Sequence, residues 1–311
     1  MQHPQIPDVP FTRTEATALG ISPHVLARLL RDGLVLRERH GLFMDAVVSA
    51  SWTPRWRHLQ IATAVAARLR GGYALGAVSA AAWHDLPTPW AWPEPLPRVC
   101  LYALGNDNAA IRRNLHVLVT PLPPDEILCD SGIAVTTLTR TAIDIARHCP
   151  LPRALIPIDG ALRAGIAREE LLEQARRQRG WPGTRMLLPT IAVASPLSES
   201  ALESFSLGTF HVHGIPRPEQ QVWVQGGSGR EYRADFLWPG ARLIGEADGW
   251  GKQGSSAEEW RRNLAQEKVR EDDLRDAGYR VIRWTFSTLD DKLPLIARRT
   301  HIRPSGSTRA H

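Results

Sequence analysis

Three carboxylates flank a strand–turn–strand pattern in the C-terminal third of the 311-residue chain. Two runs of alternating residues, 232–237 and 243–248, are separated by a Pro-Gly turn, so each run is predicted to be one strand of a hairpin. Strand side chains repeat every second residue, which puts Glu246 and Asp248 on one face. The partner strand brings Asp235 near that face.

Carboxylates that converge in this way repel one another and resist desolvation, so a fold that brings them together needs a counter-charge. Mg²⁺ is the usual choice because it takes oxygen ligands and keeps several waters, and Mn²⁺ is a common substitute. The predicted metal ligands are Asp235, Glu246 and Asp248. A metal ion there activates water for attack on a phosphodiester. The alternative is a solvated hairpin whose acids face water.

The segment after the hairpin is predicted to be a helix from Glu258 to Ala277, ended by Gly278. Lys268 lies with neighbouring glutamates on the stripe that should face inward with Leu274. The chain has three lysines and 35 arginines, so a lysine on that stripe is unusual. It could orient a hydroxide or the scissile phosphate. The alternative is an ordinary surface pair with Asp272, which is worth roughly a few tenths of a kcal/mol.

Five sequence pieces follow one another in this region. They are Leu202-Glu203-Ser204, Arg233-Ala234-Asp235-Phe236-Leu237-Trp238-Pro239, Glu246-Ala247-Asp248-Gly249, Glu267-Lys268-Val269-Arg270-Glu271-Asp272 and Gly278-Tyr279-Arg280-Val281-Ile282-Arg283-Trp284. With these pieces in this order, residues 199–290 resemble the Vsr-like branch of the PD-(D/E)XK nuclease superfamily, and in particular a small actinobacterial domain of that branch. The resemblance implies a restriction-endonuclease-like α/β/α domain with a mixed sheet flanked by helices.

The resemblance also implies roles for individual residues. Asp235 and Glu246 would bind Mg²⁺ or Mn²⁺, and Glu203 would be the helical acid beside them. The sequence departs from the superfamily pattern at Asp248, which stands where the superfamily has a lysine two residues after the second acid. Lys268 is expected to replace that lysine from the helix. The predicted catalytic residues are therefore Glu203, Asp235, Glu246 and Lys268.

Residues 11–46 carry the signals of two short helices and a hairpin. Thr12 or Thr14 caps the first helix, and Ser22-Pro23 is a strong start for the second, which runs to residue 32. Strands 34–39 and 42–44 follow, joined by His40-Gly41. This order predicts a winged helix-turn-helix, in which a recognition helix reads base edges and basic groups hold phosphates. The candidate DNA contacts are Arg28, Arg31, Arg37 and Arg39.

The letters ALGIS before the second helix and RERHGLFMDA after it give this segment a further resemblance. It is similar to the N-terminal winged helix of AbiEi-type (type IV) antitoxins, and the middle of the chain also resembles the body of these proteins. The resemblance implies DNA binding and a toxin partner. The alternative is a winged helix that only packs against the other domains.

The remainder of the chain indicates a multi-domain α/β protein. Helices are expected at 55–69 and 74–85, strands at 99–102, 115–119 and 133–136, and helices at 139–147, 152–164 and 168–177. His211-Val-His213 is read as part of a strand, with metal-like spacing that is weak evidence alone. The predicted domains are a winged helix-turn-helix (1–54), a mixed α/β middle domain (55–180), a linker (181–197), the nuclease-like domain (198–300) and a basic tail (301–311).

Composition limits the class of protein. Hydrophobic residues make up 43% of the chain, which supports packed cores. The net charge of +6 favours an anionic partner, nucleic acid first, and residues 1–195 hold 21 arginines against 16 acids. An arginine-rich proteome is the plainer explanation. The three cysteines lack CxxC spacing, which fits a reducing cytoplasm, and neither a signal peptide nor a transmembrane segment is evident.

Two functions remain open from the sequence. The first is a cytoplasmic DNA-binding protein whose C-terminal domain is a Mg²⁺-dependent DNA endonuclease. The second is a non-catalytic transcriptional regulator or antitoxin of a type IV toxin–antitoxin or defence locus, with a degenerate nuclease fold. A pure protein–protein module of a defence locus is a third, weaker possibility. DNA is the expected partner, with a toxin or another defence-locus protein as a second one, and no membrane is expected.

Overall fold

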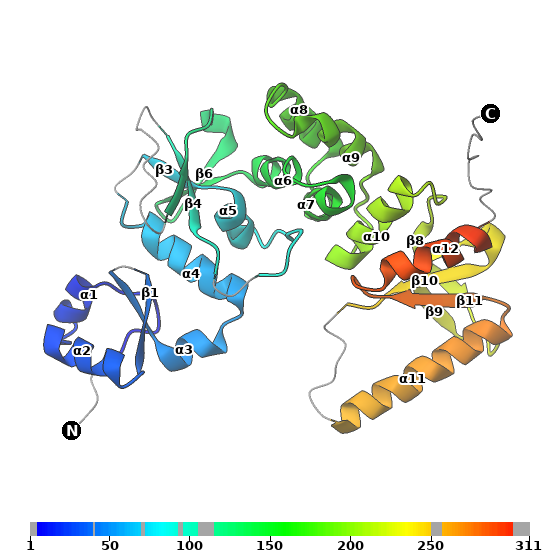
Figure 1. Cartoon of the computed structure of the whole chain (residues 1–311), viewed down its shortest axis with the longest axis horizontal. Coiled ribbons are helices and arrows are strands. Elements are labelled where there is room, and N and C mark those ends of the chain that lie inside the picture. Colours follow the sequence, from blue (N-terminus) through cyan, green and yellow to red (C-terminus); the bar gives the residue numbers. More distant parts are fainter. Residues whose placement is uncertain are drawn as a thin grey trace, which may run out of the picture. The chain divides into compact units, whose positions relative to one another are not determined.

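The computed structural model describes residues 5–39, 41–69, 72–92, 96–104, 115–249 and 257–300. The chain divides into two compact units, Met1–Ile145 and Ala146–His311, each with its own sheets and helices (Figure 1). His40 and the expected basic tail, 301–311, lie outside the described residues. Within the described part, no helix is long and apolar enough to cross a membrane.

The N-terminal segment folds as its cap signals predict. Its elements are α1 (Arg13–Ala18), α2 (Pro23–Arg31), β1 (Val35–Arg39), β2 (Leu42–Asp45) and α3 (Ala46–Ser51). Thr12 and Glu15 form a capping box on α1, and Ser22 accepts from the Val25 amide at the start of α2. Strands β1 and β2 pair antiparallel. Leu26 and Leu29 of α2 pack with Phe43 into a small core.

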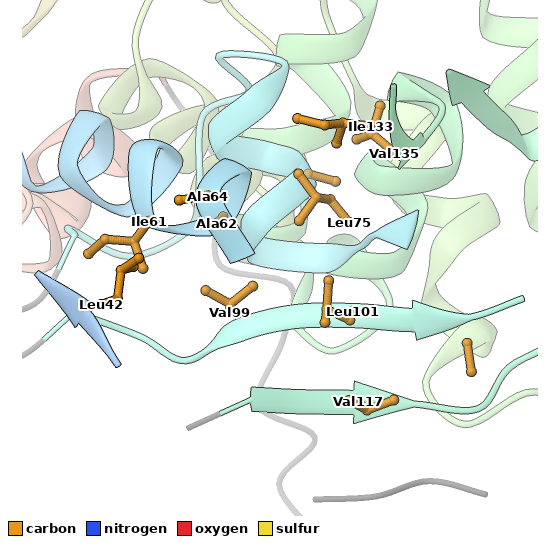
Figure 2. Close-up of a cluster of buried hydrophobic side chains, with 12 residues drawn as sticks. Leu42, Ile61, Ala62, Ala64, Leu75, Val99, Leu101, Val117, Ile133 and Val135 are labelled. Atoms are coloured by element: carbon orange, nitrogen blue, oxygen red, sulfur yellow. The ribbon is translucent and has the colours of Figure 1, made fainter. Parts of the chain in front are cut away.

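A five-stranded sheet forms the rest of the first unit, in the order β5-β4-β3-β7-β6. Its strands and the helices that pack on it are α4 (Pro54–Ala66), β3 (Tyr73–Leu75), α5 (Ala77–Trp83), β4 (Val99–Ala103), β5 (Leu115–Leu118), β6 (Ile127–Asp130) and β7 (Ile133–Thr136). Figure 2 shows Leu42 of the N-terminal hairpin beside Ile61 of α4 in the same apolar cluster as Val99. The hairpin therefore shares a core with the sheet.

The helix expected at 74–85 begins later in the structure than predicted. Residues Tyr73–Leu75 are a strand, and the helix begins only at Ala77. Gly76 lies at the break, where a Cβ would come within 2.7 Å of the Tyr102 ring. Strand β6 was not expected, because three of its four residues are exposed and no apolar alternation marks it.

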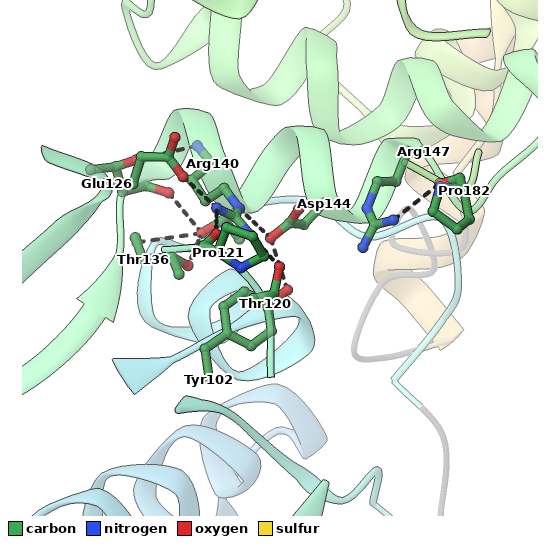
Figure 3. A network of polar contacts seen from close by, with 11 residues as sticks. Tyr102, Thr120, Pro121, Glu126, Thr136, Arg140, Asp144, Arg147 and Pro182 are labelled. Atoms are coloured by element: carbon green, nitrogen blue, oxygen red, sulfur yellow. Dashed lines mark hydrogen bonds and ion pairs between the residues drawn. The ribbon is translucent and has the colours of Figure 1, made fainter. Parts of the chain in front are cut away.

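A buried polar network holds α6 (Leu138–Ala146) to this sheet (Figure 3). Arg140 is buried and binds two acids, Glu126 and, at 2.7 Å from Nε, Asp144. Asp144 also accepts from the Tyr102 hydroxyl at 2.8 Å. Burial raises the pKa of Tyr102, and the charge of Asp144 raises it further. Each buried charge has a partner, so the network is a structural element of the first unit.

The second unit begins with helices that continue where a linker was expected. They are α7 (Leu151–Arg163), α8 (Arg168–Arg177), the 3₁₀ turn η2 (Thr184–Met186), α9 (Leu187–Val193) and α10 (Ala201–Val212). The prediction of a linker at 181–197 is therefore wrong: Leu187 and Ile191 of α9 are buried. Pro189 is tolerated because it lies in the first turn of α9, where its missing N–H has no partner to lose.

The sheet of the second unit has four strands in the order β11-β10-β9-β8. Its elements are β8 (Glu219–Gln225), β9 (Glu231–Trp238), the 3₁₀ turn η3 (Pro239–Ala241), β10 (Leu243–Ala247), α11 (Ala257–Asp276), β11 (Arg280–Trp284) and α12 (Leu289–Arg299). Strands β8, β9 and β10 are antiparallel, and β11 runs parallel to β10 after the α11 crossover. The predicted hairpin is thus present.

Helices cover both faces of this sheet (Figure 1). Phe210 of α10 and Ile296 of α12 pack with Phe236 and Trp284 on one face. Leu274 of α11 belongs to the cluster on the other face. The expected helix–sheet–helix layering is present. His211 and His213, expected on a strand, instead lie at the C-terminal end of α10.

Candidate functional site

Helix α2 presents a basic face in the first unit. His24, Ala27, Arg28 and Arg31 are exposed, while Leu26 and Leu29 are buried. The exposed residues recur at spacings of three and four, so they form one stripe along the helix. Arg28 and Arg31, both predicted DNA contacts, therefore point to the same side of α2.

The two predicted arginines of β1 have different surroundings. Arg37 is exposed, but Arg39 is half-buried and donates from Nη2 to the Pro97 carbonyl at 2.8 Å. Residues 37 and 39 would share one face of a regular strand, but the β1–β2 register shifts between them. Burial lowers the pKa of Arg39. Arg39 therefore contributes a contact within the first unit, and its role as a DNA contact stays a prediction.

An ion pair between β1 and α4 also holds the hairpin within the first unit. Glu38 of β1 accepts from Nε and Nη2 of Arg57 in α4, at 3.0 and 2.7 Å. The Glu38 side chain is almost fully buried, so this bidentate pair is shielded from solvent. Glu38 and Arg39 of β1 thus make contacts within the protein, whereas Arg37 and the arginines of α2 are exposed.

In the second unit, Asp235 marks the point where β9 and β10 separate. Their pairing runs from Leu243 opposite Trp238 to Gly245 opposite Phe236. Continued by one residue, this register would place Glu246 opposite Asp235. There the Asp235 carboxylate accepts from the Ala247 amide at 2.9 Å, in place of a backbone acceptor. The hairpin therefore places Asp235 and Glu246 near one end of the strand pair, and their role as metal ligands stays a prediction.

Glu203 reaches the same end from α10. Its carboxylate accepts from the Glu199 amide at 2.8 Å and from the Ser200 hydroxyl at 2.7 Å. Burial raises the pKa of Glu203, and the charge of Asp235 also raises it, against the effect of these donors. The two acids are therefore close enough to interact.

Gln221 is a site residue that the sequence did not reveal. Its Nε2 donates to Glu203 Oε2 at 2.8 Å, and its φ of 57° is left-handed. Gln220 and Phe236 pack toward α10, whereas Val222 and Ala234 pack toward α11. The side chains on either side of Gln221 in β8, and of Asp235 in β9, therefore point to opposite faces of the sheet. A left-handed non-glycine residue is costly, and such strain concentrates at functional sites.

Arg270 is the second residue that was missed. It lies on α11 and donates from Nη2 to Glu246 Oε1 at 2.8 Å. Lys268, which was predicted to face the acids, is exposed. The predicted inward orientation of Lys268 is therefore wrong. Arg270 lies one helical turn before the buried Leu274 and shares its stripe, whereas Lys268 lies on another side of the helix. A helical projection anchored on Leu274 would have identified Arg270.

Asp248 also has an arginine partner. Arg283 Nη1 lies 3.2 Å from Asp248 Oδ1 and 3.7 Å from Glu267 Oε1. Burial alone would lower the pKa of Arg283, but Asp248 and Glu246 raise it above its ordinary value. Arg283 is paired with Glu246 in the β10–β11 register. Two guanidinium groups therefore accompany the acids at this end of the sheet.

The acids as arranged do not fit a divalent cation. Among the residues that the structure describes, no group of three or more His, Cys, Asp or Glu side chains could hold a metal ion. Glu246 is bound by Arg270, Asp248 by Arg283, and one Asp235 oxygen by a backbone amide. Mg²⁺ needs several oxygen ligands with open lone pairs. The structure thus pairs Glu246 and Asp248 with arginine, and Asp235 with a backbone amide.

Comparison with known proteins adds one match to a family and two relatives. Residues 9–44 match the family model described as "Transcriptional regulator, AbiEi antitoxin". The uncharacterized proteins MT2308 and Rv2248 of Mycobacterium tuberculosis are each 33% identical to this chain over 153 residues. Those residues are 49% of this chain and 55% of each relative, so the match spans about half the length of these relatives. The family match coincides with α1, α2, β1 and β2.

Proposed function

We propose that the protein is a DNA-binding transcriptional regulator of the AbiEi antitoxin type, with α2 as its recognition helix. The observation that carries the proposal is the exposed stripe of His24, Arg28 and Arg31 within the matched segment 9–44. The pI of about 9.7 supports an anionic partner.

The chemistry of that stripe suits a duplex. A recognition helix enters the major groove, where arginine donates two hydrogen bonds to guanine, and neighbouring basic groups bind phosphates. Arg28 and Arg31 lie on one side of α2, and Arg37 follows on the adjacent strand as the wing contact. The ion pair between Glu38 and Arg57 holds this wing in place, because it joins β1 to α4.

A protein partner belongs to the same proposal. The family description names an antitoxin, and an antitoxin acts with a toxin. We therefore propose a toxin, or another protein of a defence locus, as a partner of this chain. Co-purification with the product of a neighbouring gene tests this proposal, and the absence of any complex under low-salt conditions would contradict it.

The DNA-binding proposal is tested by titrating labelled duplex DNA from the protein's own promoter region. Arg28→Ala and Arg31→Ala should each weaken binding about tenfold or more, and a lost phosphate contact should reduce the salt slope by about one. Arg298→Ala is the matched control, because it removes an exposed arginine from α12. Unchanged binding in both α2 variants would contradict the assignment.

A second proposal concerns the C-terminal unit: a DNA endonuclease that uses Mg²⁺ or Mn²⁺. The observation that favours it is the meeting of Asp235 and Glu246 where β9 and β10 separate, with Glu203 beside them. As the acids are arranged, Glu246 would have to leave Arg270 before it could bind a metal ion. Arg270, which the sequence analysis did not single out, is the basic residue beside the acids, the position that was predicted for Lys268.

Cleavage assays test the second proposal. Plasmid, mismatched and single-stranded DNA would be incubated with the full chain in Mg²⁺ or Mn²⁺. Cutting that is lost in both Asp235→Ala and Glu246→Ala supports the endonuclease. Absence of cutting on every substrate with either metal contradicts it and leaves the regulator as the function of the whole chain.

A further inference from the structure

Glu246 is the most deeply buried acid of the C-terminal hairpin, with 2% of its surface exposed. A buried carboxylate is costly unless a cation or several hydrogen-bond donors lie against it. Arg270 supplies the cation, at 2.8 Å. Any divalent ion that bound Glu246 would need the same region of space and the same negative charge.

Arg270 is held at this position by more than one contact. Its Nη2 also donates to the Arg233 carbonyl at 2.7 Å, and its guanidinium lies 5.8 Å from the centre of the Tyr232 ring. These contacts place the guanidinium over β9, next to the acid. A planar guanidinium fixed on three sides loses little freedom when it pairs with a carboxylate.

The same arginine also has features that allow it to leave. A quarter of its side-chain surface is exposed, and its Nε–H is buried without an acceptor in the described part of the chain. An unsatisfied buried donor costs free energy, which lowers the cost of moving the side chain away. Arg270 is therefore anchored but not fully satisfied.

We propose that Arg270 and a divalent cation compete for Glu246, and that Arg270 is the built-in counter-ion that occupies the site in the resting protein. The inference rests on the second proposed function, since it concerns the same carboxylates. It explains why acids that converge at the end of a hairpin show no arrangement suited to a metal. Metal binding then requires that Arg270 first leaves Glu246.

The test measures Mn²⁺ binding to the full chain by electron paramagnetic resonance of the free ion, which does not depend on cleavage. Arg270→Gln should bind Mn²⁺ at least tenfold more tightly than the wild type. The gain should disappear when Glu246→Gln is added. Arg275→Gln is the matched control, because Arg275 is on the same helix but pairs with Glu271 on its exposed side, and it should bind Mn²⁺ like the wild type.

Arg270→Lys provides a second variant in case Arg270→Gln does not fold, which circular dichroism would show. Lysine keeps the positive charge but cannot reach Glu246 and the Arg233 carbonyl with the same planar geometry, so a smaller gain in the same direction is expected. Equal Mn²⁺ affinity in the wild type and the folded Arg270 variants would overturn the inference.

The possible failures are distinguishable. If the wild type binds Mn²⁺ through Glu246 and the Arg270 variants bind equally well, the competition is overturned while the metal site of the proposed endonuclease stands. If neither the wild type nor any Arg270 variant binds Mn²⁺, the inference and the metal-dependent endonuclease are both contradicted.

Discussion

At the scale of the residue, Asp159 is the acid whose charge opposes folding most clearly. It lies within α7, is fully buried, and accepts from the Ser195 amide at 2.8 Å. Burial raises its pKa to about 6, although the Ser195 amide works in the other direction. A folded-state pKa above the unfolded value means that the native protein binds the extra proton, so stability is lost as pH rises through about 6.

Asp159→Asn should remove this pH dependence. Between pH 4.5 and 8, the free energy of unfolding of the wild type should fall by about 2 kcal/mol relative to the variant. Urea unfolding at both pH values measures the difference, and Asp291→Asn, an exposed acid of α12, is the control. A difference between the wild type and Asp159→Asn that is the same at both pH values would contradict the assigned burial effect.

The candidate site shows how far residue types alone could lead. Asp235 and Glu246 were predicted from the spacing of acids on two strands, whereas Glu203 was predicted only from the resemblance to the nuclease superfamily. Arg270 was missed because lysine seemed the exceptional residue in a chain that is so rich in arginine. Gln221 could not have been found, because its role depends on a left-handed backbone that no local pattern marks.

At the scale of the element, the turn before α9 carries the strongest steric constraint in the region that the sequence suggested to be a linker. Gly183 has a φ of 83°, and a Cβ there would lie 1.9 Å from the Arg147 carbonyl oxygen. Arg147 also donates to the Pro182 carbonyl in this turn at 3.0 Å (Figure 3). The glycine therefore permits close contact between two backbone segments.

Gly183→Ala should destabilise the second unit by more than Gly180→Ala does. Both residues are left-handed, but nothing lies within 4 Å of a Cβ at Gly180. Gly180→Ala should therefore cost only the backbone strain of about 1–2 kcal/mol, and Gly183→Ala should cost more because of the added steric clash. Thermal unfolding of both variants measures this order, and equal losses would show that the turn relaxes without difficulty.

Helices and strands were predictable where local signals decide them. Ser22 followed by Pro23 predicted the start of α2, and the Pro-Gly turn predicted the hairpin of β9 and β10. Local signals failed where tertiary packing decides. Residues 181–197 contain the glycines and prolines of a linker, yet α9 folds there because Leu187 and Ile191 are buried.

At the scale of the whole molecule, the two units carry different chemistry. The first unit presents Arg28 and Arg31 on the exposed side of α2, and Glu38 of β1 pairs with Arg57 of α4. The second unit directs two arginines inward, onto its own acids. DNA binding is proposed for the first unit because the exposed stripe of α2 lies in the segment 9–44 that matches the AbiEi antitoxin family model. Net charge indicated an anionic partner, but only the burial of individual arginines shows which of them remain exposed.

The most direct measurement compares duplex DNA binding by two variants of the full chain. Arg28→Ala combined with Arg31→Ala changes only α2, and Asp235→Ala changes only the carboxylate site. The account predicts that the α2 variant loses at least a hundredfold in affinity while Asp235→Ala binds like the wild type. Strong binding by the α2 variant, together with a loss in Asp235→Ala, would contradict the account and place DNA recognition in the C-terminal unit.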